Sequence, residues 1–325
     1  MISPIANPNI DDLSALPALE ALDAFQTRPR PIASVVTAIS TLEGAGFPVR
    51  RPFPSSALSL ADPFLLLDHM GAVDYKPGEA KGAPDHPHRG FETVTYMLAG
   101  AMEHRDSTGG GGVITPGATQ WMTAGGGIVH SEMPPEQMIR EGGLMHGFQL
   151  WVNLPRADKM IAPRYQGIEA GQVSLLRSQD GGAMVRLIAG ELGGHKGPGM
   201  THTPIVLAHA SLAPAALLEL SWPREFNALA YVISGYGFAG PERAPIGEGQ
   251  LAVFGDGEAI TLLGPKDQGP NLEVLLLGGQ PLREPVARYG PFVMSTRDEI
   301  IQAMADYQAG RMGHIPPAVT APSAD

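Results

Sequence analysis

Short apolar segments, each bounded by glycine, proline or aspartate, follow one another along this chain from about residue 32 onward. The clearest extends from Phe91 to Leu98, is rich in threonine, valine and aromatic residues, and ends at Gly100. Runs of this length and composition are typical of β-strands. Further candidate strands are Val35–Val36, Val49–Arg50, Phe64–Leu67, Met102–Arg105, Val113–Ile114, Gln120–Met122, Ile128–Glu132 and Phe148–Leu154. The pattern predicts an all-β protein, either an antiparallel sandwich or a barrel.

Helix signals are confined to the two ends of the chain. Residues 296–309 are predicted to be helical, because Asp298 and Glu299 fall in the first turn and Gly310 follows the last. Near the N-terminus, residues 11–22 begin with two aspartates that could cap a short helix rich in leucine, and a partly disordered tail is the alternative. We therefore expect an N-terminal extension at residues 1–31 and a C-terminal helix and tail at residues 296–325.

The second half of the chain repeats the plan of the first in weaker form. Residues 227–235 are similar to residues 92–100, shifted by 135 positions, and the turn at 248–249 matches the turn at 116–117, shifted by 132. The three-residue difference falls in the intervening loop, where changes in length are tolerated best. We therefore expect two antiparallel β-barrel domains, at residues 32–160 and 161–295.

Composition narrows the chemistry. The 325 residues include 41 glycines and 31 prolines but no cysteine, which excludes disulfides, thiol catalysis and thiolate metal sites. The net charge is −11 and no block of lysine or arginine occurs, so direct binding of nucleic acid is not expected. We see neither a signal-peptide pattern nor an apolar run of membrane-spanning length, and we expect a soluble cytoplasmic protein without a membrane partner.

The residues that carry chemistry are His86 and His88, separated by one proline. Side chains at i and i+2 of an extended segment point to the same side, so both imidazoles can reach one ion. His130 and Glu132 have the same spacing and begin 42 positions after His88. Two such pairs on neighbouring strands would supply three nitrogens and one carboxylate oxygen. This ligand set favours iron(II), then manganese, nickel or copper, over structural zinc.

Other polar residues are weaker candidates. Glu92 follows His88 by four positions and is the second choice for the carboxylate ligand. His69 and His146 are expected to be hydrogen-bonded core or cavity-edge residues, and His104 to lie at a charged strand end. The histidines without a partner at ligand spacing are His195, His202, His209 and His314.

Several segments together resemble the pirin family, from about residue 32 to residue 295. They are His86–Tyr96, Gln120–Gly125, Gly127–Pro134, Gly147–Pro155 and Asp62–Gly71. The resemblance implies a bicupin, in which two jelly-roll barrels face each other and the N-terminal one holds iron(II). It places the family's metal ligands on the four residues chosen above from their spacing. Gly100 lies one residue later than the general cupin pattern expects, and the second motif ends in His-x-Glu; both departures are features of pirins.

The internal repeat predicts a single metal site per chain. At the shift of 135 positions, His86 and His88 correspond to Ser221 and Pro223, and at the shift of 132, His130 and Glu132 correspond to Leu262 and Gly264. None of these four is a useful ligand, so the C-terminal barrel is expected to be metal-free.

The resemblance implies two classes of function. Some pirins are similar to quercetin 2,3-dioxygenases, which open a flavonol ring with O2 and release carbon monoxide; here Glu132 would be both metal ligand and catalytic base. Other pirins resemble regulatory proteins, in which the oxidation state of the iron alters the surface offered to a protein partner. A metal that only stabilises the barrel is the third alternative.

Overall fold

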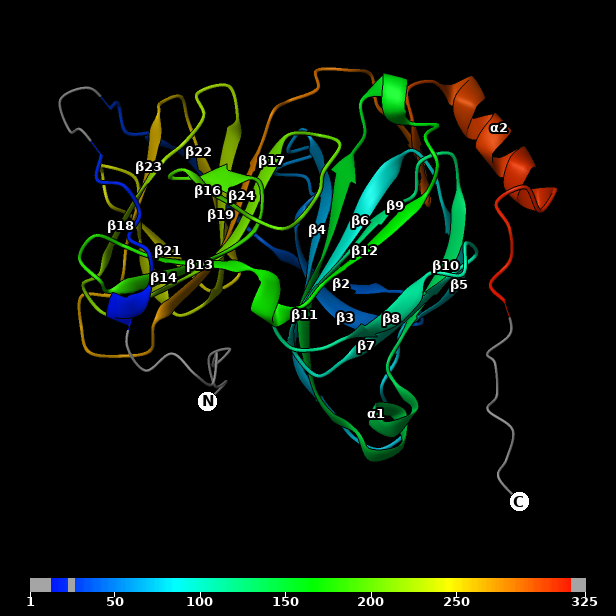
Figure 1. Cartoon of the computed structure of the whole chain (residues 1–325), viewed down its shortest axis with the longest axis horizontal. Coiled ribbons are helices and arrows are strands. Elements are labelled where there is room, and N and C mark those ends of the chain that lie inside the picture. The colour runs from blue at the N-terminus through cyan, green and yellow to red at the C-terminus, as the bar shows by residue number, and fades with distance from the viewer. Residues whose placement is uncertain (1–12, 23–26, 317–325) are drawn as a thin grey trace.

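The computed structural model describes residues 13–22 and 27–316, which form two β-barrels side by side, with a helix at the outer side of the first (Figure 1). The all-β class, the two barrels and the C-terminal helix expected from the sequence are confirmed. The other helical elements are short: η1 (Leu13–Ala15), α1 (Glu136–Glu141), η2 (Arg156–Asp158) and η3 (Ala170–Gln172).

The first barrel consists of a seven-stranded and a four-stranded antiparallel sheet. The larger sheet has the order β12-β9-β6-β11-β4-β3-β2, and the smaller has the order β5-β10-β7-β8. Eight of the nine positions of β6 are buried, which explains its continuous apolar and threonine-rich sequence. The bounds are β2 (Ile39–Glu43), β3 (Phe47–Phe53), β4 (Phe64–Tyr75), β5 (Ala83–His88), β6 (Phe91–Ala99), β7 (Met102–Asp106), β8 (Gly111–Ile114), β9 (Thr119–Thr123), β10 (Ile128–Met133), β11 (Gly143–Asn153) and β12 (Arg164–Ile168).

The second barrel repeats this arrangement strand for strand. Its sheets have the orders β1-β22-β19-β24-β17-β14-β13 and β18-β23-β20-β21. The bounds are β1 (Ile32–Thr37), β13 (Ser174–Arg177), β14 (Ala183–Ala189), β17 (Ile205–Leu212), β18 (Leu217–Ser221), β19 (Asn227–Ser234), β20 (Tyr236–Ala239), β21 (Ala244–Gly247), β22 (Gln250–Phe254), β23 (Ala259–Leu263) and β24 (Leu272–Gly279), and a separate two-stranded ribbon is formed by β15 (Glu191–Leu192) and β16 (His195–Lys196).

The large sheet of each barrel ends in a strand from outside the block of sequence expected for that barrel. β1 precedes the strands of the first barrel and pairs with β22 of the second, and β12, which lies after residue 160, pairs with β9 of the first. Only β1 therefore crosses from one end of the chain to the other barrel, while β12 extends the first barrel past the expected limit. The domain limits expected at residues 32–160 and 161–295 stay a prediction about blocks of sequence.

One buried cluster is shared by the two large sheets, which pack face to face. All its members are buried. Burial of aromatic and branched side chains from both halves removes a large apolar area from water and fixes the barrels against each other. The cluster includes Phe64, Val94, Tyr96, Trp121 and Phe148 from the first barrel, and Leu207, Leu229, Tyr231, Leu275 and Leu277 from the second.

After the second barrel the chain returns to the first. β25 (Ala287–Tyr289) and β26 (Phe292–Met294) form a hairpin, and α2 (Arg297–Gln308) follows it. Thr296 caps α2 in a capping box with Glu299. The apolar side of this segment covers the outside of β10, in a cluster formed by Val129, Phe292, Met294, Ile300, Ala303 and Met312.

The N-terminal segment contains less helix than the sequence predicts. The two aspartates at 11 and 12 lie outside the described residues, and only one turn of 3-10 helix is present before Leu16. Leu19 is 2% exposed and packs in the core of the second barrel, and its N–H donates to the carbonyl of Arg177. The chain is extended there because pairing with Arg177 and burial of Leu19 outweigh the weak helix propensity of a segment that contains Pro17.

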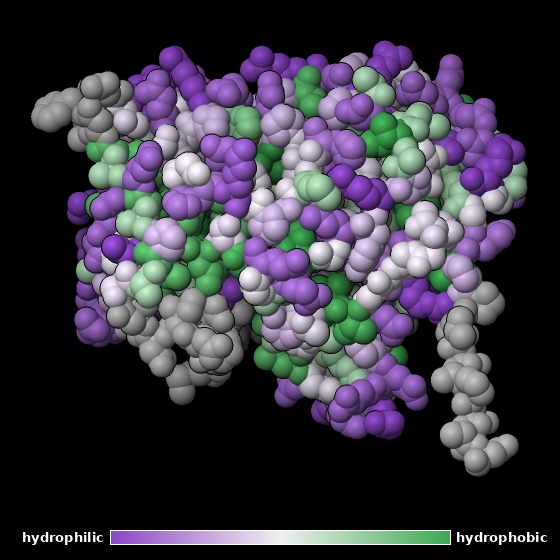
Figure 2. Space-filling view, in the orientation of Figure 1, coloured by the Kyte–Doolittle hydropathy of each residue, from purple (hydrophilic) through white to green (hydrophobic). Residues whose placement is uncertain are grey.

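The face of the molecule in Figure 2 is covered mainly by polar residues, with small hydrophobic areas between them. None of the described helices has the length and apolar character needed to cross a membrane.

Candidate metal centre

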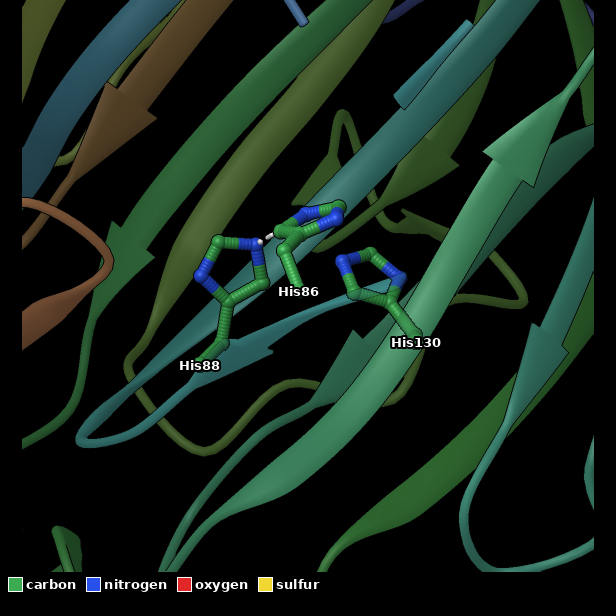
Figure 3. Close-up of side chains that lie close together, drawn as sticks. All are labelled: His86, His88 and His130. Carbon is green, nitrogen blue, oxygen red and sulfur yellow. Dashed lines mark hydrogen bonds between the residues drawn. The ribbon is translucent and has the colours of Figure 1, made fainter. Parts of the chain in front are cut away.

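The register of the small sheet brings three histidines together. His86 on β5 lies directly opposite His130 on β10, so both side chains point to the same face, and His88 follows on that face of β5. The ring centroids are 4.3 Å apart for His86 and His130, 4.7 Å for His86 and His88, and 4.8 Å for His88 and His130. Figure 3 shows the three rings facing a common point.

Backbone carbonyls determine the tautomers of His86 and His88. Nδ1 of His86 lies 2.7 Å from the carbonyl of Pro84, and Nδ1 of His88 lies 3.2 Å from that of Pro291. Each Nδ1 must therefore carry the hydrogen, which leaves both Nε2 atoms as acceptors. These two Nε2 atoms face each other at 3.1 Å. Two lone pairs so close are unfavourable unless a cation lies between them, so the pair fits a metal ion.

A contact with His104 determines the tautomer of His130. Nε2 of His104 donates to Asp106 at 3.1 Å, and its Nδ1 accepts from Gln120 at 2.8 Å. That Nδ1 is also 3.3 Å from Nδ1 of His130, which therefore acts as the donor of the pair. Nε2 of His130 remains buried without a partner among the described residues. A bare buried nitrogen beside two others is the donor that a metal ion would use.

The pKa values of the buried groups agree with this assignment. Burial lowers the pKa of His88 and of His130 well below the ordinary value, and the neighbouring histidines lower both further. Both rings are therefore neutral at pH 7 and keep their lone pairs. Burial by itself would raise the pKa of Asp106, but hydrogen bonds from His104 and Thr108 outweigh it and lower the pKa to about 2.

Glu132 lies at the same site but is grouped differently. Its ligand atom clusters with those of His130 and His104, while the other cluster contains His86, His88 and His130. A bulge after His130 shifts Glu132 to a position opposite Ala83, and in the other direction it pairs with His104. Oε1 accepts from Thr95 at 2.6 Å. Oε2 has only a long contact of 3.4 Å from Gln149, so it is the freer of the two oxygens.

Apart from His104, the other candidate residues lie outside both clusters of potential ligands. Glu92 is in neither cluster: it is fully buried in the large sheet, where it accepts from Thr123 at 2.7 Å. His69 and His146 are hydrogen-bonded to each other at 2.7 Å in the core, as expected. Among the described residues, neither candidate cluster contains His195, His202, His209 or His314.

His104 is the site residue that the sequence reasoning missed. The expectation that it lies at a charged strand end is wrong. His104 is fully buried on β7 against Gln120, His130 and Tyr165. The available signal was the spacing of His104 and Asp106, the same i, i+2 relation that identified the other pairs.

A cavity of about 500 Å3 opens in front of the histidines. Its wall is mainly apolar and includes Phe47, Leu66, Met70, Met102 and Trp151. Thr95, Glu132 and Gln149 line it together with His86 and His88, and further charged groups in the wall are Glu43, Asp68 and Asp85. Arg288 lies at the rim, 4.7 Å above the ring of Trp151. The cavity can therefore receive a flat apolar molecule with its polar edge toward the histidines.

Comparisons with known proteins agree with the fold. A family model described as Pirin matches residues 46–152, and one described as Pirin C-terminal cupin domain matches residues 207–313. A pirin-like protein of Solanum lycopersicum is 42% identical over 294 residues, which cover 90% of this chain and 96% of that protein. A putative quercetin 2,3-dioxygenase of Pseudomonas aeruginosa is 42% identical over 270 residues, covering 82% of this chain and 93% of that one.

A solved structure has the same architecture over nearly its whole length. The crystal structure of a quercetin 2,3-dioxygenase from Acinetobacter baumannii superposes with a TM-score of 0.80 at 35% identity, covering 88% of this chain and 99% of that one. The family models, the relatives and the two matching barrels lead to one conclusion: this chain belongs to the pirin family.

Proposed function

We propose that this protein is a mononuclear iron(II) enzyme that opens a flavonol ring with O2, in the manner of a quercetin 2,3-dioxygenase. The observation that carries the proposal is the meeting of three bare imidazole nitrogens with an open, apolar-walled cavity. A metal that only stabilised the barrel would not need a cavity of about 500 Å3 in front of it. Relatives named as quercetin 2,3-dioxygenases support the substrate class.

His86, His88, His130 and Glu132 are the proposed ligands. Three neutral nitrogens and one carboxylate oxygen suit iron(II) and leave coordination positions open; manganese, nickel and copper would suit the same set. The histidines already present their lone pairs. Glu132 would have to turn Oε2 toward them, which would break the long contact with Gln149. A bound iron would supply the redox-active centre at which the flavonol and O2 are brought together.

The protein's own contribution is to accept a proton and to hold the rings. Both atoms of O2 enter the ring-opened product and one ring carbon leaves as carbon monoxide, so no external reductant is needed. The proton of the flavonol 3-hydroxyl would pass to the carboxylate of Glu132, since this carboxylate lines the cavity. Trp151 and Phe47 would contact the flat rings and exclude water from the reacting edge.

Anaerobic reconstitution with iron(II), followed by addition of quercetin and air, tests the activity. The proposal expects loss of the flavonol absorbance with release of carbon monoxide in equal amount. Glu132→Gln should lower kcat by about 100-fold or more, because the amide cannot accept the proton. Iron that binds without any turnover would contradict the dioxygenase proposal and leave the metal site standing.

A regulatory role has one structural observation in its favour. His88 donates to the carbonyl of Pro291. Arg89, which follows His88 in the sequence, forms an ion pair of 2.7 Å with Asp306 on α2. A change of charge at the metal could therefore reach a surface helix through two contacts. The same experiment decides between the roles: stoichiometric iron without turnover would favour a redox-sensing protein with a protein partner.

A further inference from the structure

At the seam between the barrels lie two hydrogen-bonded series of polar side chains that take no part in the candidate metal site. We call them the first and the second hydrogen-bond chain. In one, the hydroxyl of Tyr231 lies 3.0 Å from Nδ1 of His69, whose Nε2 lies 2.7 Å from Nε2 of His146. In the other, the hydroxyl of Tyr96 lies 2.9 Å from Nδ1 of His209, whose Nε2 lies 3.0 Å from Oε2 of Glu273. Each tyrosine comes from one barrel and its histidine from the other.

The two chains are equivalent by the internal repeat. Tyr96 pairs with Phe148, which pairs with His69, just as Tyr231 pairs with Leu275, which pairs with His209. A bulge one step further along places His146 in the first barrel where Glu273 stands in the second. The first chain therefore ends in an imidazole at the position where the second ends in a carboxylate.

Glu273 fixes the direction of the second chain. Burial by itself would raise the pKa of Glu273. The interaction with His209 and a hydrogen bond from Ser211 outweigh this effect and lower the pKa. The carboxylate accepts, so His209 donates through Nε2 and accepts the hydroxyl hydrogen of Tyr96 at Nδ1. Every hydrogen in this chain has an acceptor.

The first chain runs in the same direction but lacks an acceptor at its end. The hydroxyl hydrogen of Tyr231 has no described partner except Nδ1 of His69, so His69 donates through Nε2 to Nε2 of His146. His146 must then carry its hydrogen on Nδ1. His146 is only 3% exposed, and this buried Nδ1–H has no partner among the described residues. An unsatisfied buried donor is costly and calls for an acceptor.

His146 lines a cavity of about 370 Å3 at the seam, separate from the one at the metal centre. Arg50 lies in the same wall, and its positive charge adds to the effect of burial in lowering the pKa of His146 to about 4. Nη1 of Arg50 donates to Glu248 at 2.7 Å, while Nε and Nη2 have no acceptor among the described residues. The apolar part of the wall is formed by Pro48, Val49, Val73 and Ile233.

We propose that this seam cavity binds a small organic carboxylate. One carboxylate oxygen would accept from Nδ1–H of His146, and the carboxylate would also meet the Nε and Nη2 edge of Arg50, the geometry in which guanidinium groups hold carboxylates. The apolar part of the ligand would contact Val49, Val73 and Ile233. The site lies between the barrels and is independent of the proposed dioxygenase activity.

Two neighbours of Arg50, Glu248 and Gly71, affect how easily a ligand reaches its guanidinium group. Glu248 competes for the guanidinium, but its side chain is 53% exposed and an exposed ion pair contributes little, so a ligand can replace it. Gly71 leaves the guanidinium edge open: a Cβ there would stand 3.7 Å from Nη2 and 3.8 Å from Nε. A larger side chain at this position would occupy the place of the carboxylate.

Calorimetric titration of the iron-loaded protein with sodium benzoate tests the proposal, with neutral benzamide as the matched ligand. We expect benzoate to bind, Arg50→Gln to weaken it about tenfold or more, and Gly71→Val to prevent it. His146→Phe should weaken binding severalfold, and Glu248→Gln should strengthen it by removing the competing carboxylate. Benzamide should bind much more weakly than benzoate.

Binding of benzoate at the metal is distinguished by His88→Ala, which should lose any metal-bound benzoate but keep the seam site. No binding to the wild-type chain, or binding that is lost in His88→Ala and retained in Arg50→Gln and Gly71→Val, would overturn the proposal. If Arg50→Gln is poorly folded, Gly71→Val alone decides, because it keeps every charged group at the seam.

Discussion

The histidines of the proposed metal centre differ in the groups that hold them in position. His86 and His88 donate to backbone carbonyls, which no substitution can remove, whereas His130 depends on the side chain of His104. His104 depends in turn on Asp106 and Gln120. Contacts of this kind orient metal ligands and increase their affinity for the ion. The metal affinity should therefore be sensitive to a residue that does not itself reach the cavity.

Substitution His104→Leu tests this dependence. It removes the acceptor of the His130 Nδ1–H, and we expect the dissociation constant for iron(II) to rise by about 10- to 100-fold. The measurement is competition with a chromogenic chelator under anaerobic conditions. His202→Gln, an exposed residue of the second barrel, is the control and should bind iron as the wild type does. Equal affinity in both variants would show that His104 has no such role.

His146 gives the stability of the chain a dependence on acid pH. Burial and the charge of Arg50 lower its pKa to about 4 in the folded protein, below the unfolded value of about 6.5. The unfolded chain therefore takes up the proton first as the pH falls. The contribution is fully present above pH 6.5 and is lost as the pH falls toward 4, by up to about 3 kcal/mol.

Urea unfolding at pH 7.5 and pH 5 measures this effect. The difference in unfolding free energy between the two pH values should be smaller in His146→Gln than in the wild type, because glutamine does not titrate. The exposed His202→Gln variant should keep the wild-type difference. A pH dependence in His146→Gln as steep as that of the wild type would contradict the account.

At the scale of single residues, spacing in the sequence was enough to bring His86, His88 and His130 together, because side-chain direction in a strand follows a period of two. Glu132 was placed correctly on the strand, but its grouping with His104 depends on a bulge that the sequence does not reveal. The pairing partners of β10 had to be known before His104 could be recognised.

Among the elements, the C-terminal hairpin and α2 hold the turn between β5 and β6. Gly90 in this turn has a φ of +89°, and a Cβ there would collide with the carbonyl oxygen of Val293. Lys159 is buried and donates to the carbonyls of both Gly90 and Val293. Together with the contact between His88 and Pro291, these bonds attach the second half of the chain to the proposed metal ligands of the first.

Asp306→Asn tests whether α2 supports the site. Arg89 is only 5% exposed in its side chain, and Asp306 is its charged partner, so the loss of that charge should destabilise the protein by about 2 kcal/mol. We also expect faster amide exchange in β26 than in the wild type. The control is Asp298→Asn at the exposed start of the same helix, which should have a smaller effect. Exchange in β26 that remains at the wild-type rate would contradict this role.

Element identity was predictable, while the pairing of elements was not. Strand sequences such as that of β6 carry their own signal, and α2 begins and ends close to the predicted residues. Nothing local in β1 shows that it completes the sheet of the second barrel, or in β12 that it belongs to the first, because the choice of partner depends on contacts far apart in the chain. The N-terminal segment likewise is extended because of a distant partner, Arg177.

For the whole molecule, duplication explains why two similar barrels carry one candidate site. The strand pair β5–β10 corresponds to β18–β23, and His130 corresponds to Leu262 at the shift of 132 positions. The register places Leu218, not Ser221, opposite Leu262, and both leucines are buried in the second core. Apolar side chains thus fill the place of the imidazoles, and a single metal ion per chain stays the prediction.

The iron content of the chain after anaerobic reconstitution and removal of excess metal is the most direct test of the central claim. We expect one iron ion per wild-type chain, almost none in His88→Ala, and one in His195→Ala, which changes a histidine of the second barrel. Circular dichroism should show that all three are folded. Full iron in His88→Ala, or no iron in the wild type, would contradict the assignment of the metal centre to His86, His88, His130 and Glu132.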